Sequence, residues 1–132
     1  MIVIDCSALV PALTSRAKDA HLLRARIAQA GTVFAPTLLD YEIQSALLSM
    51  ERGGKLGQTQ VIKAIDDYRQ LPLTRHETLP LFERIRALRQ NLSVYDAQYV
   101  ALAETLGTPL ITCDARIARS GAATCPIEVF TL

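Results

Sequence analysis

Four acidic residues in this 132-residue chain occupy positions from which carboxylates could do chemistry together. Two of them, Asp5 and Asp114, each end an apolar run that we predict to be a strand buried on both faces. In open α/β sheets, ligands bind beyond the carboxyl ends of the strands, so both acids are expected to line one crevice. The alternative is that each Asp only caps the helix after it, because Asp is a favoured N-cap residue.

The other two acids lie on predicted helices. Glu42 falls at the edge of the apolar stripe of a helix over residues 37–52, where an unpaired charge would cost several kcal/mol. Its alternative role is a salt bridge to an arginine. Asp96 falls in the first turn of a helix over residues 94–106 that is apolar nearly all round. Its alternative role is a capping box with Ser93.

A shared metal site explains all four acids at once. Carboxylate oxygens suit hard cations, so the cluster predicts Mg²⁺, with Mn²⁺ as a possible substitute. Zinc is not favoured, because His21 and His76 are isolated and the three cysteines form no Cys-x-x-Cys pair. The chain has neither a phosphate-binding glycine loop nor a Ser-His or Cys-His arrangement that proposes a triad.

Alternating strands and helices predict an α/β fold, a central parallel β-sheet flanked by helices on both faces. We expect one domain over residues 1–132. Thr37 and Asp40 are expected to form a capping box, and Asp19 to cap an earlier helix. Strands are expected at residues 2–4, 32–35, 71–74, 109–113 and 127–130. Helices are expected to begin at residue 8, to run from 19 to about 30, and to cover residues 37–52, 58–70, 77–90 and 94–106.

Composition limits the classes of partner. The net charge is +1, from 14 basic and 13 acidic residues, so no strongly basic surface is predicted. No apolar run reaches the roughly 18 residues of a membrane span. The N-terminus lacks a basic leader and a cleavage site. Together with the odd cysteine count, these features predict reduced thiols, a cytoplasmic protein and no membrane partner.

Four segments, taken in their order and spacing, resemble the PIN-domain nucleases and specifically the VapC type of toxin ribonuclease. They are residues 1–9, 35–42, 95–104 and 110–114. The resemblance implies a PIN-like fold in which Asp5, Glu42, Asp96 and Asp114 bind the metal. Ser7 and Thr112 match small hydroxyl positions that line the same pocket. Residues 115–118 supply no further acid of the kind some relatives carry, so one metal or two is left open.

The resemblance also implies a function. It is that of a Mg²⁺-dependent endoribonuclease, the toxin of a toxin–antitoxin pair, with RNA as substrate, a small antitoxin protein as partner and a homodimeric state. Arginines around the crevice would track the RNA strand. The candidates for that contact are Arg16, Arg75, Arg84, Arg86 and Arg116.

Three other classes fit parts of the pattern. A haloacid dehalogenase-type phosphatase also has an Asp after its first strand, but it requires a second acid where this chain has Ser7. A receiver domain would need an acid pair after the first strand, which is missing. A catalytically inactive PIN-like interaction module would be expected to have lost one or more of the four acids, and all are present.

Overall fold

The computed structural model describes residues 1–132 and contains one all-parallel, five-stranded sheet. The strand order is β3-β2-β1-β4-β5, so the first strand of the chain is the central one. All five strands are short, with three or four residues each. Their bounds are β1 Ile2–Ile4, β2 Val33–Pro36, β3 Leu73–His76, β4 Leu110–Thr112 and β5 Ile127–Val129.

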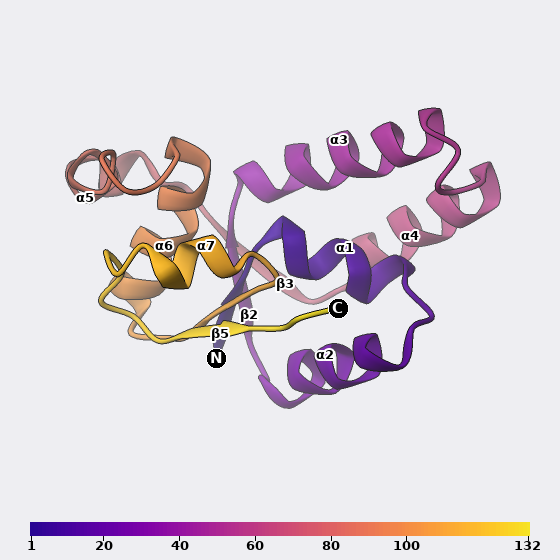
Figure 1. Cartoon of the computed structure of the whole chain (residues 1–132), viewed down its shortest axis with the longest axis horizontal. Coiled ribbons are helices and arrows are strands. Elements are labelled where there is room, and N and C mark those ends of the chain that lie inside the picture. The colour runs from indigo at the N-terminus through magenta and orange to yellow at the C-terminus, as the bar shows by residue number, and fades with distance from the viewer.

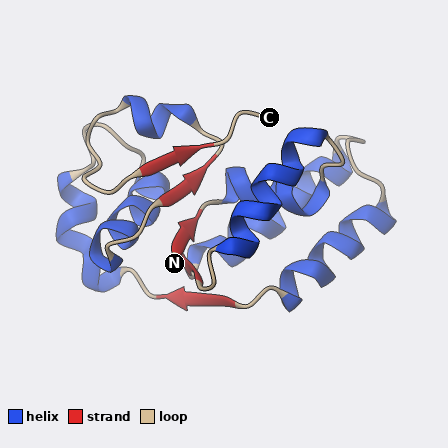
Figure 2. Ribbon diagram, turned by 90° about the horizontal axis from the view of Figure 1, so that it is seen from below, coloured by secondary structure: helices blue, strands red, loops and turns tan.

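Seven α-helices and one 3₁₀ turn connect the strands (Figure 1). They are α1 Cys6–Thr14, α2 Lys18–Gln29, α3 Leu38–Arg52, α4 Gln58–Gln70, η1 Leu79–Leu81, α5 Phe82–Ala87, α6 Val94–Leu106 and α7 Ala115–Arg119. The strands lie as a band between two groups of helices (Figure 2). Helix α1 packs on α2, α3 and α4, while α6 packs on α5 and on the central strands, which confirms the predicted covering of both faces.

The strand order reverses at the centre of the sheet. From β1 the chain winds outward through β2 to β3, then returns to β4 on the other side of β1 and ends at β5. Strand β1 therefore pairs with both β2 and β4, with Val3 opposite Phe34 on one side and Leu110 on the other. Ligands of open α/β sheets bind at such a switch point.

An aliphatic core holds these central elements. Twenty-eight buried residues form one hydrophobic cluster, and every residue of β1 and β4 is buried. Helix α6 is buried from Tyr99 to Ala103, as expected of a central helix. Ser93 caps it by accepting from Asp96 N, and Gly107 ends it at a positive φ of 65°. None of the helices combines the length and the apolar character needed to cross a bilayer.

The predicted helix over residues 77–90 is confirmed only over residues 82–87. The structure has only the 3₁₀ turn and the short helix α5 there. Pro80 lies in that turn; its ring removes a backbone donor and disfavours the α conformation of the residue before it. The α-helical segment begins only after Pro80, at Phe82.

Two predicted caps are also wrong. The Thr37 side chain makes no capping bond, because Thr37 is itself in the αR conformation. Asp40 instead accepts hydrogen bonds from Tyr68 on α4, at 2.5 Å, and from Arg75 on β3, at 2.9 Å. Helix α2 begins at Lys18 without a side-chain cap, so Asp19 lies in its first turn instead.

Candidate metal centre at the carboxyl end of the sheet

Asp5 directly follows β1 and is 5% exposed. Its Oδ1 accepts from Ala8 N at 3.1 Å and from Ser7 Oγ at 2.7 Å, while its Oδ2 accepts from Thr112 Oγ1 at 2.5 Å. Burial, with a smaller contribution from the charge of Asp96, raises the pKa of Asp5 to about 6, although the three hydrogen bonds lower it. Asp5 therefore caps α1, as the alternative held, and also lies in the crevice.

Ser7 and Thr112 orient Asp5 and join it to the end of β4. Ser7 Oγ accepts from Cys113 N at 2.9 Å, and Thr112 Oγ1 accepts from Asp114 N at 3.0 Å. Both hydroxyls thus bond the Asp5 carboxylate and the backbone that leads to Asp114. The two residues lie at the site, as the resemblance implied, in contact with one of its acids.

Glu42 lies on α3 and points toward α6. Its Oε1 accepts a hydrogen bond from the hydroxyl of Tyr99, which is buried. Burial raises the pKa of Glu42, and the charge of Asp96 adds to the effect. No salt bridge to an arginine forms at Glu42, so the alternative role predicted for it is wrong.

Asp96 lies half-buried in the first turn of α6. Its backbone N–H donates to Ser93 Oγ at 3.1 Å, but no reciprocal bond completes a capping box. Burial raises the pKa of Asp96, and the charge of Asp114 raises it further. Carboxylate repulsion therefore connects Asp96 to Asp5, Glu42 and Asp114.

Asp114 follows β4 and caps α7 by accepting from Arg116 N at 3.0 Å. The Arg116 guanidinium also donates to both carboxylate oxygens, with its closest contact at 2.8 Å from Nη2 to Oδ2. This ion pair lowers the pKa of Asp114. The Arg116 side chain is 78% exposed, so the pair is open to solvent and to competing cations.

The types of ligand at this site fit a hard divalent cation, although the four carboxylates do not converge on one point. The carboxylate cluster, defined as Asp5, Glu42, Asp96 and Asp114, offers oxygen ligands only. No three His, Cys, Asp or Glu side chains converge closely enough to hold one ion. Arg116 is paired with the Asp114 carboxylate, which a cation at this acid would have to displace. The pKa values of Asp5, Glu42 and Asp96 are all raised. A bound cation would stabilise the charged form of each and so lower these pKa values.

The sequence patterns did not identify Tyr99 or Arg116 as contacts of the carboxylate cluster. Tyr99 is three positions after Asp96, about one helical turn further, and lies in the buried, otherwise aliphatic centre of α6. A polar group on such a face requires a partner, which was the available signal. Arg116 carried no signal, because its pairing depends on the conformation of the α7 cap.

Most of the arginines proposed for RNA contact are already paired. Arg75 bonds Asp40, Arg84 bonds Glu104 and Arg116 bonds Asp114. Arg16 lies near the far end of α1, in a hollow with Arg24 and Lys63. Arg86 forms no salt bridge and lies near Val94 at the start of α6, so it is the candidate that is both unpaired and close to Asp96.

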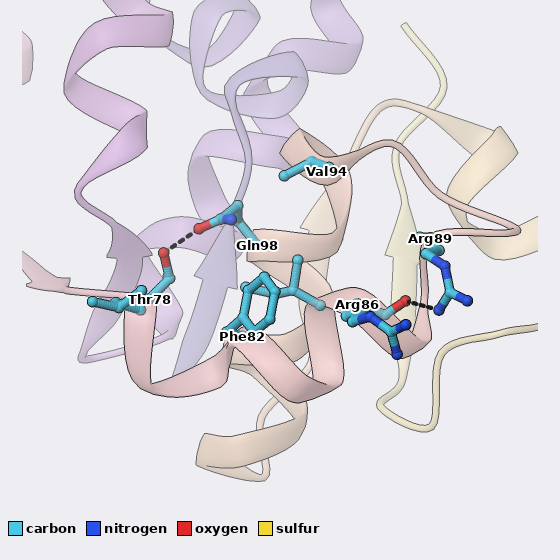
Figure 3. Close-up of a pocket in the computed structure, with 8 residues that line it drawn as sticks. Thr78, Phe82, Arg86, Arg89, Val94 and Gln98 are labelled. Carbon is cyan, nitrogen blue, oxygen red and sulfur yellow. Dashed lines mark hydrogen bonds between the residues drawn. The ribbon is translucent and has the colours of Figure 1, made fainter.

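Arg86 borders a hollow of about 480 Å³ that also includes Arg89, Phe82 and Val94 (Figure 3). On the opposite side, Thr78 and Gln98 are joined by a side-chain hydrogen bond (Figure 3). Neither arginine forms a salt bridge; the Arg89 guanidinium donates only to the Arg86 carbonyl, at 2.9 Å. The hollow therefore has two uncompensated positive charges on its rim and apolar side chains inside.

A doubly wound parallel sheet with carboxylates at its switch point defines the class to which this chain belongs. It is a member of the PIN domain family, whose sequence profile matches residues 2–122. Within the family it is of the VapC type. It is similar to ribonuclease VapC9 of Mycobacterium tuberculosis, with 41% identity over 129 residues that cover 98% of each chain.

Solved structures agree on the fold. The crystal structure of PAE2754 from Pyrobaculum aerophilum superposes with a TM-score of 0.68 and 25% identity, covering 97% of this chain and 90% of that one. VapBC2 of Rickettsia felis, solved bound to a DNA fragment from its promoter, gives a TM-score of 0.68 at 16% identity. It covers 99% of this chain and 100% of that chain, and at this identity shows the fold alone.

Proposed function

We propose that this protein is a Mg²⁺-dependent endoribonuclease that hydrolyses phosphodiester bonds in RNA. The observation that carries the proposal is that Ser7 and Thr112 hold the Asp5 carboxylate and bond the backbone leading to Asp114 at the sheet switch point. Asp96 lies near enough that its charge raises the pKa of Asp5 and of Glu42. The similarity to proteins named VapC ribonucleases supports the same reaction. Because the chain belongs to the PIN family, a phosphatase of the haloacid dehalogenase type is no longer the alternative.

The carboxylate cluster is where a divalent cation would be held. When bound, Mg²⁺ or Mn²⁺ would neutralise a phosphate and lower the pKa of a water molecule. Ser7 and Thr112 fix the Asp5 carboxylate, and Tyr99 fixes that of Glu42, so both acids are oriented before any ligand arrives. Without a cation the cluster repels RNA, because its charges are negative.

Arg86 and Arg89 are proposed to contact the RNA backbone. They border the same hollow as Val94, the first residue of α6. Asp96 lies two residues after Val94 on that helix. Their guanidinium groups face no carboxylate, so a phosphate would meet them without displacing a partner. These contacts would offset the repulsion from the acids near the reacting phosphate.

A cleavage assay on pooled cellular RNA tests the proposal. Cleavage is expected with Mg²⁺ or Mn²⁺ and not with EDTA, and D96N should be inactive under all conditions. Cleavage that persists in EDTA, or that zinc alone supports, would show that the metal assignment is wrong. Thermal unfolding of the wild type across Mg²⁺ concentrations gives a readout independent of activity, with stability expected to rise by ligand linkage. Absence of cleavage despite metal binding would favour the inactive interaction module.

We also propose that the protein acts as the toxin of a toxin–antitoxin pair and forms a homodimer. The support is its VapC type and the identity of 41% with named VapC ribonucleases. A short reading frame just upstream that encodes a partner would support the pairing, and co-expression of that partner should suppress cleavage. Sedimentation equilibrium of the purified chain tests the dimer, which a monomer at micromolar concentration would contradict.

A further inference from the structure

A second hollow, of about 400 Å³, lies on the other side of the α6 start and includes one member of the carboxylate cluster. We call it the tyrosine hollow. Its side chains come from α3, from the first turn of α6 and from Cys6 at the start of α1, and through Glu42 it borders the candidate metal centre. The other residues that line it are Tyr41, Ser45, Ala46, Ser49 and Tyr95.

The two tyrosines of this hollow are unusually exposed for the chain. Tyr41 is 65% exposed and Tyr95 is 56% exposed, whereas Tyr68 and Tyr99 are 6% and 2% exposed and hydrogen-bonded to acids. Exposed aromatic rings leave apolar surface in contact with water, and a ligand could cover that surface. Tyr41 and Tyr95 line the same hollow as Glu42, and Tyr95 directly precedes Asp96 in the first turn of α6.

The remaining surface of the hollow determines what fits there. Ser45, Ala46 and Ser49 have small side chains, so space is left over α3 between the two rings. Glu42 is the only charged residue present, and no cation lines the hollow. A phosphate would therefore be repelled, while an uncharged, flat group that can stack on phenol rings would be accepted.

We propose that the tyrosine hollow binds one nucleobase of the RNA, next to the phosphate that is cleaved, by stacking on Tyr41 and Tyr95. The proposal rests on the proposed ribonuclease function and adds a base site to it. A phosphate held at the cluster carries a base on each side, and Glu42 belongs to both the cluster and the hollow. Stacking on aromatic rings is the usual way in which proteins hold unpaired RNA bases.

Single abasic substitutions, moved along a short RNA substrate, test the base site. With the wild type, KM is expected to rise about tenfold when the abasic position is one particular neighbour of the cleavage point, and much less elsewhere. Y41A/Y95A should show this higher KM on the intact RNA and no further effect of the abasic site. Y41F/Y95F keeps both rings and should stay within about twofold of the wild type. L22A, an exposed residue on α2, is the surface control.

A binding readout separates this proposal from the ribonuclease function. The chain has four tyrosines and no tryptophan, so its intrinsic fluorescence reports tyrosine alone. In a D96N background with Mg²⁺, single-stranded RNA should quench this fluorescence, and the added Y41A/Y95A change should remove the quenching. Quenching without cleavage by the wild type would retain the base site and overturn the nuclease.

The opposite results overturn the base site. Cleavage with equal KM for the wild type and Y41A/Y95A, and without position-dependent abasic effects, would leave the nuclease standing and reject stacking. Neither cleavage nor quenching would reject both. A loss of dimer in Y41A/Y95A with unchanged kinetics would assign the two rings to a second copy of the chain, and would also reject the base site.

Discussion

Thr112 Oγ1 donates a 2.5 Å hydrogen bond to Asp5 Oδ2 and accepts one from Asp114 N at 3.0 Å. One hydroxyl thus connects the ends of the two central strands and holds one acid of the cluster while fixing the backbone of another. Thr112 is fully buried, so water cannot replace either bond. The site depends on this residue although it carries no charge.

T112V should lower the free energy of unfolding at pH 8 by about 2 kcal/mol, because a buried carboxylate loses a donor and a backbone N–H loses its acceptor. The Thr112 bond lowers the pKa of Asp5, so its loss should raise that pKa further. Urea unfolding at pH 8 measures the stability. T112S retains the hydroxyl and should lose clearly less; equal losses in both variants would show that packing, rather than the hydroxyl, is responsible.

Metal-free D5N should be as stable as the wild type near pH 4 and more stable above pH 6. The folded pKa of Asp5 is about 6, above the unfolded value of 3.8, so the wild type loses stability as pH rises between these values. That loss corresponds to about 3 kcal/mol at most, and the neutral amide avoids it. Unfolding by urea across pH 4 to 8, in EDTA, tests this dependence.

Cleavage by D5N should nevertheless be absent. Added Mg²⁺ should stabilise D5N less than the wild type, since a ligand charge is gone. A variant that is less stable than the wild type at every pH, with an unchanged response to Mg²⁺, would show that Asp5 is only a helix cap.

E42Q should abolish cleavage, while D40N should retain most of it, although the two acids lie two residues apart on α3. Asp40 bonds Tyr68 and Arg75 on the side away from the carboxylate cluster. The Asp40 side chain is 42% exposed, so loss of its charge should cost only about 1 kcal/mol of stability. Turnover and thermal unfolding of both variants measure the contrast, and equal inactivation would show that α3 presents a different face to RNA.

R86A should raise KM for RNA and weaken the dependence of binding on salt, with kcat close to that of the wild type. Each phosphate contact to single-stranded RNA contributes a slope of about 0.7 in log K against log salt. The matched control is R69A on α4, where the arginine is paired with Asp66. Identical salt slopes in R86A, R69A and the wild type would place the RNA backbone elsewhere.

Strand and helix types could be predicted where the apolar pattern was strong. The buried run before Asp5, the stripe of α3 and the nearly all-apolar α6 each left one interpretation, and the four acids followed from their places on these elements. A charged group on an apolar face is a local signal that needs no tertiary information.

Long-range partners could not be predicted in the same way. Asp40 fits a capping box by its spacing, yet Arg75 and Tyr68, 35 and 28 positions later, provide stronger bonds. The strand order likewise depends on how distant elements dock, whereas the pairing of Arg116 with Asp114, two positions away, depends on the local conformation of the α7 cap. At residues 77–90 two local signals conflict: the apolar spacing favours a helix, while Pro80 disfavours the α conformation of Leu79.

The central position of β1 has a consequence for the protein during its own synthesis. Asp5 emerges from the ribosome first, but Thr112, its hydrogen-bond partner, follows 107 positions later. At about 5–20 residues per second, roughly 5–20 s separate the two. Strand β1 has β4 as a neighbour only after this interval, so the acids at the two strand ends cannot meet in a shorter nascent chain. A nuclease built on this topology would be inert on the ribosome until the chain has been synthesised through β4.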